Sequence, residues 1–270
     1  MSSLLSSIEQ GIVRRMSLAR YCAVVNAANA VSGRTHRVAP LRPDGLYRVT
    51  IGDEEIVICR RARHRRYKRG VLAFTEKLAA EYGLTTIADV GGGSFIDCGA
   101  NVGELGLWAR HHGMHYTAFE PEPLEADCID LNLFDGTPRT RRVALWHERD
   151  TLEFFSAPDT ADSSLFEIDK SVGRMQVPAI PLDEADVPLS DSGPNILKLE
   201  AEGAEPEILD GATDTLPKLH YVAVDCGYER GREKRHTFID VCDRLLPLGF
   251  RPVEANLRRV TVLFKNTALV

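Results

Sequence analysis

Two groups of residues in this chain have the types and the spacing to bind a nucleotide-like ligand. The first is a glycine turn, Asp97-Cys98-Gly99-Ala100-Asn101-Val102-Gly103, between a predicted strand at residues 95–98 and a predicted helix at residues 103–112. Cofactor-binding turns require this order of strand, turn and helix. The second is Glu120, which ends the next predicted strand 23 positions after Asp97. An acidic residue at this distance can accept hydrogen bonds from both ribose hydroxyls of an adenosine.

A second glycine-rich segment, residues 87–93, competes for the same role. It is followed by residues 94–96, which read as a strand rather than a helix, so we interpret residues 91–93 as a lead-in loop. The Gly-x-Gly-x-x-Gly fingerprint of nicotinamide-binding domains is not complete either, because residues 97–103 lack its middle glycine. We therefore expect the turn at residues 97–103 to bind an adenosine-containing cofactor other than a nicotinamide dinucleotide.

Short strands and helices alternate from Ser94 to the end of the chain. Strands are predicted at residues 95–98, 115–119, 141–145, 196–199 and 221–225, and helices at residues 103–112, 123–134, 204–209 and 234–246. This alternation predicts an α/β fold with a parallel sheet covered on both faces, which binds ligands at the carboxyl ends of its strands. Residues 251–254 and 260–264 predict a hairpin that would form an antiparallel edge of the sheet.

Three stretches of the chain resemble the FkbM family of S-adenosylmethionine-dependent methyltransferases. They are residues 95–103, residues 118–121 (Ala-Phe-Glu-Pro) and residues 197–205 (Leu-Lys-Leu-Glu-Ala-Glu-Gly-Ala-Glu), and the similarity extends over about residues 94–226. The resemblance implies a class I methyltransferase (Rossmann-like) domain with a seven-stranded, mostly parallel sheet and an antiparallel C-terminal edge hairpin. It also implies the cofactor S-adenosyl-L-methionine and O-methylation of a hydroxyl, often on a sugar or a natural product.

The resemblance assigns cofactor-binding roles to five residues. By position, Asp97, Gly99, Asn101 and Gly103 would line the methionine end of the cofactor, and Glu120 would bind the ribose. The family usually has an aspartate where this chain has Glu200, and the longer side chain would change the geometry toward the acceptor or a metal.

Carboxylates follow the predicted strand at residues 196–199. We expect Glu202 and Glu200 to be catalytic, because methyl transfer to a hydroxyl needs a base that removes its proton and burial can raise the pKa of a carboxyl to suit. His220, His147 and Asp225 are weaker candidates. Capping of the following helix is an equal alternative for Glu202. Glu200, Glu202 and Asp225 could also hold a hard metal, but their spacing is not diagnostic, so we assign no metal.

Residues 1–86 do not show the alternation of short strands and helices found in the rest of the chain. We therefore expect a helical and hairpin extension before a methyltransferase domain of residues 87–270. An amphipathic helix is expected at residues 4–30, packing on the main domain or on a second subunit, so a homo-oligomer is an option. A role at a membrane surface is its lesser alternative. Residues 46–51 and 55–59 predict a hairpin, and residues 71–82 predict a helix.

A basic stretch at residues 60–69 holds seven Arg or Lys residues, with His64 and Tyr67 interleaved. Charge runs of this kind are usually solvated loops. Arginine also makes bidentate contacts with phosphate, so we expect Arg65, Arg66 and Arg69 to bind an acceptor that carries phosphate. A nucleotide-linked sugar, a lipid-linked glycan or RNA would fit.

Composition limits the remaining choices. The formal net charge of −6 disfavours a nucleic-acid binder that relies on overall basicity, and no apolar run reaches the ~20 residues of a membrane span. The six cysteines are scattered without metal-binding spacing, which fits a reducing, cytoplasmic compartment. The sequence thus predicts an O-methyltransferase for a small-molecule or glycan acceptor. An RNA methyltransferase and a cofactor-binding scaffold without turnover are the alternatives.

Overall fold

The computed structural model describes residues 16–156 and 173–269. The chain divides into two compact units, Met1–Phe74 and Thr75–Val270. This division lies inside helix α3 (Val71–Glu81), earlier in the chain than the boundary between residues 86 and 87 expected from the sequence. Within the described residues, no helix is both long and apolar enough to cross a bilayer.

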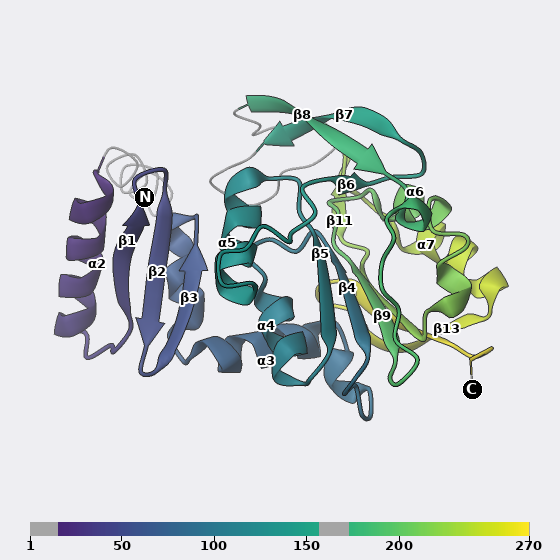
Figure 1. Cartoon of the computed structure of the whole chain (residues 1–270), viewed down its shortest axis with the longest axis horizontal. Helices are drawn as coiled ribbons and strands as arrows, with labels where there is room; N and C mark the ends of the chain where they lie inside the picture. Colours follow the sequence, from purple (N-terminus) through teal and green to yellow (C-terminus); the bar gives the residue numbers. More distant parts are fainter. Residues whose placement is uncertain (1–15, 157–172, 270) are drawn as a thin grey trace. The chain divides into compact units, whose positions relative to one another are not determined.

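The N-terminal unit combines a helix with a small antiparallel sheet. Helix α2 (Leu18–Val31) packs against β1 (Arg37–Arg42), and β2 (Leu46–Ile51) and β3 (Glu54–Ile58) complete the order β1-β2-β3 (Figure 1). The hairpin predicted at residues 46–59 is confirmed as the β2–β3 pair. The first part of the helix predicted at residues 4–30, residues 4–15, lies outside the described residues.

The basic stretch forms a 3-10 helix, η1 (Arg61–Tyr67). Its side chains divide into two sets, because Arg63, His64 and Tyr67 are buried while Arg65 and Arg66 are exposed. Interpreting the whole stretch as a solvated loop is therefore wrong. The three-residue period of the helix turns every third side chain, positions 64 and 67 included, toward the same side.

Two buried histidines join η1 to the start of β1. The rings of His36 and His64 stack with their centroids 5.4 Å apart, and His36 Nε2 lies 3.2 Å from His64 Nδ1. Asn29 Nδ2 in α2 donates to His36 Nε2 at 3.1 Å. Because His36 Nε2 accepts from Asn29, His64 carries its hydrogen on Nδ1 and donates it to the same atom. Both rings are neutral in this arrangement.

The second unit contains a six-stranded mixed sheet with the order β13-β14-β10-β9-β4-β5. The four parallel strands are β4 (Ser94–Cys98), β5 (His115–Phe119), β9 (Asn195–Leu199) and β10 (Tyr221–Asp225). The antiparallel edge is the hairpin of β13 (Phe250–Asn256) and β14 (Thr261–Asn266). The α/β architecture and this edge hairpin are confirmed.

Helices cover both faces of this sheet. One face carries Leu197, Leu199 and Val224 and packs on α6 (Glu205–Asp210) and α7 (Phe238–Leu245). The other carries Phe95 and Ile196 and packs on α3 and α4 (Glu104–His111), while α5 (Pro123–Leu133) follows β5 (Figure 1). Burial on both faces explains why these parallel strands read as continuous apolar runs.

The prediction of seven strands in one sheet is wrong for the described residues. Arg141 makes a single parallel bridge to Phe119 at the edge of the sheet. The chain then leaves that edge, and β6 (Ala144–Leu145) pairs with β8 (Gly173–Ile180) instead. With β7 (Asp150–Ser156), these strands form a separate sheet of order β6-β8-β7. The remaining short strands, β11 (Tyr228–Arg230) and β12 (Arg235–His236), pair with each other.

The histidine pair makes the N-terminal unit sensitive to acid. Burial, His36 and three nearby cations lower the pKa of His64 to about 4, whereas an unfolded histidine has a pKa of about 6.5. Between these values the unfolded chain binds more protons than the folded one, so stability falls as pH drops from about 6.5 toward 4. We expect a loss of about 1–2 kcal/mol between pH 7.5 and pH 5.

Hydrogen exchange of the β1–β3 amides, corrected for intrinsic exchange rates, measures this loss. In His64→Phe the titrating group is removed and the aromatic ring is kept, so the loss should be smaller. Equal protection free energies at the two pH values in the wild type would contradict the prediction.

Candidate functional site

The predicted cofactor turn connects β4 to α4, as the sequence order required. Gly99, Asn101 and Gly103 all have positive φ angles, of 71°, 56° and 84°. A Cβ atom on Gly99 would lie 1.9 Å from the carbonyl oxygen of Glu200 in the neighbouring chain segment. Glycine is therefore required at position 99 by the close approach of the backbone that follows β9, and not only by the approach of a ligand.

Glu120 follows β5 and is tied directly to this turn. Its Oε2 accepts a hydrogen bond from the backbone N–H of Asn101 at 2.8 Å, and its Oε1 accepts from the N–H of Glu122 at 3.0 Å. Burial and the nearby charges of Glu125 and Glu122 raise the pKa of Glu120 to about 8. The structure thus brings the turn and the acidic strand end together.

Asn101 has an unused acceptor in this turn. Its side-chain Oδ1 is buried and has no hydrogen-bond partner among the described residues. A buried polar atom without a partner is costly, so a donor on a bound ligand would stabilise it. Together with the carboxylate of Glu120, this atom gives the turn the acceptors that a ligand with amino and hydroxyl groups requires.

Asp97 lies beneath the turn in a buried ion pair. Its Oδ1 is 3.0 Å from Lys198 Nζ, and its Oδ2 accepts from the hydroxyl of Tyr116 at 2.9 Å. Lys198 Nζ also donates to the carbonyl oxygens of Cys98 and Gly99, at 3.0 and 2.8 Å. Asp97 is 1 % exposed and Lys198 is 2 % exposed. Asp97 therefore acts on the turn through Lys198, which fixes the path of the turn backbone.

Glu200 is held between two cations. Its Oε2 lies 3.3 Å from Lys198 Nζ, and its Oε1 lies 2.7 Å from an Nη of Arg259 in the β13–β14 hairpin. Burial alone would raise the pKa of Glu200, but the charges of Lys198 and Arg259 lower it to about 2. A carboxylate with so low a pKa is a poor proton acceptor.

Arg259 extends this network to the end of β10. The same Nη lies 2.9 Å from Oδ2 of Asp225, and the other Nη lies 3.1 Å from Oε2 of Glu81. Within residues 16–156 and 173–269, no group of three or more His, Cys, Asp or Glu side chains is arranged to hold a metal ion. Glu200 and Asp225, which we considered as metal ligands, are bridged by the guanidinium of Arg259 instead.

Glu202 lies in the turn between β9 and α6, with a positive φ of 51°. Helix α6 begins after Ala204, and its N-cap makes no side-chain hydrogen bond. Glu205 holds this turn: its Oε1 accepts from the N–H groups of Ala201 and Gly203 and its Oε2 accepts from Thr237. Glu205 is 1 % exposed, so this carboxylate in the first turn of α6 is buried rather than solvated.

Glu229 in β11 is a carboxylate that the sequence analysis missed. Burial and the charges of Asp225, Glu200 and Glu205 raise the pKa of Glu229 to about 8. Its carboxyl carbon lies 3.5 Å from where a Cβ on Gly227 would be, close to the end of β10. Among the described residues it makes no hydrogen bond and no ion pair. The charged residues that act on it come from three segments, at residues 200–205, 225 and 259, so a short stretch of sequence does not reveal its environment.

The weaker histidine candidates lie elsewhere. His220 precedes β10, and its Nδ1 accepts from the N–H of Asn195, the first residue of β9. It therefore lies at the amino ends of the strands, at the opposite edge of the sheet from the cofactor turn. His147 follows β6 beside the exposed Glu148. Arg65 and Arg66 of η1, together with Arg69, are exposed on the N-terminal unit.

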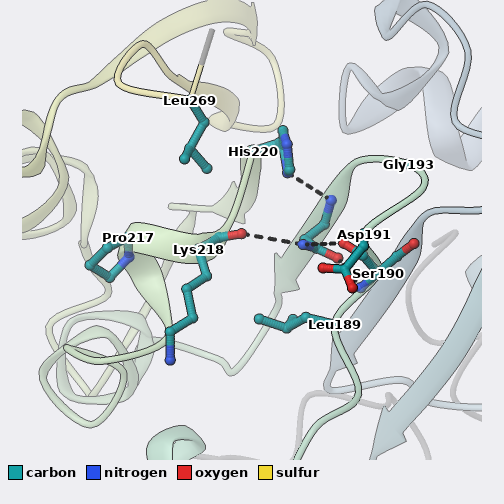
Figure 2. Close-up of a pocket in the computed structure, with 9 residues that line it drawn as sticks. Leu189, Ser190, Asp191, Gly193, Pro217, Lys218, His220 and Leu269 are labelled. Atoms are coloured by element: carbon teal, nitrogen blue, oxygen red, sulfur yellow. Dashed lines mark hydrogen bonds between the residues drawn. The ribbon is translucent and has the colours of Figure 1, made fainter.

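A pocket of about 630 Å³ also lies at the amino ends of β9 and β10 (Figure 2). Its polar groups bond to one another: Asn195 accepts from the Ser190 N–H and donates to the carbonyl oxygens of Ser190 and Lys218. These groups are already satisfied, and the pocket lies away from the cofactor turn. We therefore do not assign the chemistry to it.

This chain is similar to a known protein family and to solved structures. Residues 97–252 match the methyltransferase FkbM domain family. A methyltransferase FkbM from Methylobacillus flagellatus KT aligns at 16 % identity and a TM-score of 0.46 over 72 % of this chain and 50 % of its own length. A Thermoplasma acidophilum protein aligns at 14 % identity and a TM-score of 0.34, over 73 % of this chain and 89 % of its own. No protein of curated function matches the chain.

Lys198→Met should destabilise the second unit strongly. The substitution keeps the volume but leaves the carboxylates of Asp97 and Glu200 without their shared cation. Removing one partner of a buried ion pair costs about 3–5 kcal/mol. Urea denaturation monitored by tryptophan fluorescence measures the change, and Lys218→Met at an exposed position is the matched control. A loss below about 1 kcal/mol would show that the network does not stabilise this edge.

Proposed function

Because the chain belongs to the FkbM methyltransferase family, we propose that it transfers a methyl group from S-adenosyl-L-methionine to a hydroxyl of a carbohydrate or secondary metabolite. The observation that carries this proposal is the hydrogen bond from Asn101 to Glu120, which joins the glycine turn to the acidic strand end. Since the chain aligns with half the length of the Methylobacillus protein, the acceptor must be identified for this chain itself.

The residues of the turn fit the proposed cofactor. Glu120 retains acceptor capacity for ribose hydroxyls, and Asn101 Oδ1 is free to accept from an amino group. We propose that Gly99 and Gly103 line the methionine end through their backbone, and that Asp97 supports them through Lys198. When bound, S-adenosyl-L-methionine supplies an electrophilic methyl group on a positively charged sulfur.

The acceptor hydroxyl must lose a proton during the reaction, and Glu229 and Glu202 are our candidates for accepting it. A base works best when its pKa is near the operating pH, and Glu229 meets this condition. Glu200 instead stabilises Lys198 and Arg259. We place Glu229 first, since its pKa is raised toward the operating pH whereas that of Glu200 is lowered.

The charge of the N-terminal unit supports an acceptor that carries phosphate. Residues 1–74 hold fourteen Lys or Arg and five Asp or Glu, a net charge of +9. The whole chain has −6, so residues 75–270 carry −15. Charge asymmetry of this size is typical of proteins with a polyanionic partner. We propose that Arg65, Arg66 and Arg69 contact such an acceptor. The same observation keeps RNA as the second candidate.

The proposal is tested by incubating the protein with S-adenosyl-L-methionine labelled in its methyl group. Separate pools of nucleotide sugars, other metabolites and RNA serve as acceptors. Label on a sugar or metabolite oxygen supports the proposal, and label on RNA supports the second candidate. Tight cofactor binding without transfer to any pool would indicate a scaffold. The reduced cysteines also lead us to propose a cytoplasmic location, and α2 remains our candidate for a homo-oligomer contact.

Glu120→Ala should weaken S-adenosylhomocysteine binding by about 1.5–3 kcal/mol, the value of a hydrogen bond to a charged group. In the wild type, affinity should rise as pH increases from 6.5 to 8.5. Ribose hydroxyls donate to the ionised carboxylate, and the pKa of Glu120 is about 8. Titration calorimetry measures both effects, with the exposed Glu148→Ala as control. Equal affinity of Glu120→Ala and wild type would contradict the cofactor assignment.

Glu229→Gln should lower turnover by about 10²–10⁴-fold, the contribution of a general base, and leave S-adenosylhomocysteine affinity unchanged. Wild-type turnover should rise with pH through about 8, because only the ionised carboxylate accepts a proton. Glu202→Gln is the matched variant and should lose less than tenfold. Turnover of both variants is measured with the acceptor identified in the labelling experiment. A larger loss of turnover in Glu202→Gln than in Glu229→Gln would identify Glu202 as the general base.

A further inference from the structure

The N-terminal unit gathers positive charge at one place on its surface. The contact between His36 and His64 brings the segment after α2, which carries Arg34, next to η1. Arg65 and Lys68 follow His64 on this second segment. Arg34 lies two positions before His36 and Arg65 directly follows His64, and the charges of Arg34, Arg65 and Lys68 all act on the buried His64 ring. We call these three residues the basic cluster.

Several other cations of this unit have partners, unlike those of the basic cluster. Arg42 pairs with Asp44, and Arg48 lies 3.5 Å from Glu55. Arg61 donates to the hydroxyl of Tyr47 and lies over the ring of Tyr21. Arg34, Arg65 and Lys68 are exposed and have no anionic partner among the described residues. Three like charges at one place repel each other, so an anion bound between them would be favoured.

The ring beneath the cluster also has an unsatisfied atom. His64 is 4 % exposed, and its Nε2 has no hydrogen-bond partner among the described residues. Because Nδ1 carries the hydrogen that points to His36, Nε2 is an acceptor in the neutral ring. This atom can take up a proton, and an anion bound nearby would favour the protonated ring.

We propose that Arg34, Arg65 and Lys68, with His64 beneath them, form a binding site for a phosphate group. Arginine binds phosphate oxygens in a bidentate manner, and lysine adds a mobile point charge. The negative charge of a phosphate monoester offsets the repulsion within the cluster and favours protonation of the buried His64 ring nearby. The ligand is therefore a soluble molecule with a terminal phosphate or diphosphate. This inference rests on the N-terminal unit alone and does not depend on the proposed methyl transfer.

The test uses the full-length protein, with inorganic phosphate and pyrophosphate as probes and sodium chloride at equal ionic strength as reference. Histidine ring resonances are followed by NMR, and His64→Phe assigns the His64 signal. The expected result is a saturable shift of that signal and a rise in the pKa of His64 from about 4, since a bound anion favours the charged ring.

Matched variants distinguish a specific phosphate-binding site from nonspecific electrostatic attraction of anions. Arg34→Gln and Lys68→Gln should each weaken probe binding about tenfold or more, whereas Arg48→Gln, an exposed arginine of β2, should leave it unchanged. Because both positions of the cluster are exposed, these variants should fold, and circular dichroism checks this. Phosphatidylglycerol vesicles are a further probe, for attraction to a membrane surface. The proposal is overturned if phosphate gives no saturable shift, if Arg48→Gln weakens phosphate binding as much as the cluster variants do, or if the protein binds the vesicles but neither soluble probe.

Discussion

Lys198 is the residue on which the carboxyl edge of the large sheet depends. Its ammonium group lies within 3.3 Å of carboxylate oxygens from Asp97 and Glu200, and it holds two carbonyl oxygens of the glycine turn. A lone charge buried this deeply would be prohibitive, so the sheet tolerates Lys198 only because two strand ends supply the compensating anions. Strand register and turn path are thereby fixed by one cation.

The same edge carries more negative than positive charge. Lys198 and Arg259 face Asp97, Glu200 and Asp225, and Glu229 lies near Asp225 at the same edge. Burial is the main reason why the pKa values of Glu120, Glu205 and Glu229 rise to about 8, 7 and 8, and the charges of neighbouring carboxylates add to the rise for Glu120 and Glu229. Excess negative charge in a partly buried edge favours a positively charged ligand, and the sulfonium of the proposed cofactor is one.

The sequence predicted what depends on local pattern. The turn at residues 97–103, the acidic strand end at Glu120 and the terminal hairpin follow from periodicity and from residue types a few positions apart. The number of strands in the large sheet and the partners of Glu200 depend instead on contacts between distant segments. Residues 144–145 pair with β8, more than thirty positions away, and Arg259 reaches Glu200 across 59 positions. Neither this strand pairing nor this ion pair can be predicted from a short window of sequence.

The basic stretch shows the same limit within ten residues. Its charge was plain in the sequence, but the division between Arg63, which is buried, and Arg65, which is exposed, follows from the 3-10 helix and from the stacking of His64 on His36. Folding therefore sorts a uniform charge run into side chains that build the unit and side chains that face solvent. Because the two units carry net charges of opposite sign, each favours a different ligand: the acidic unit a cation and the basic unit an anion. A methyl donor with a positive sulfur and an acceptor with a phosphate are a pair of substrates with these charges.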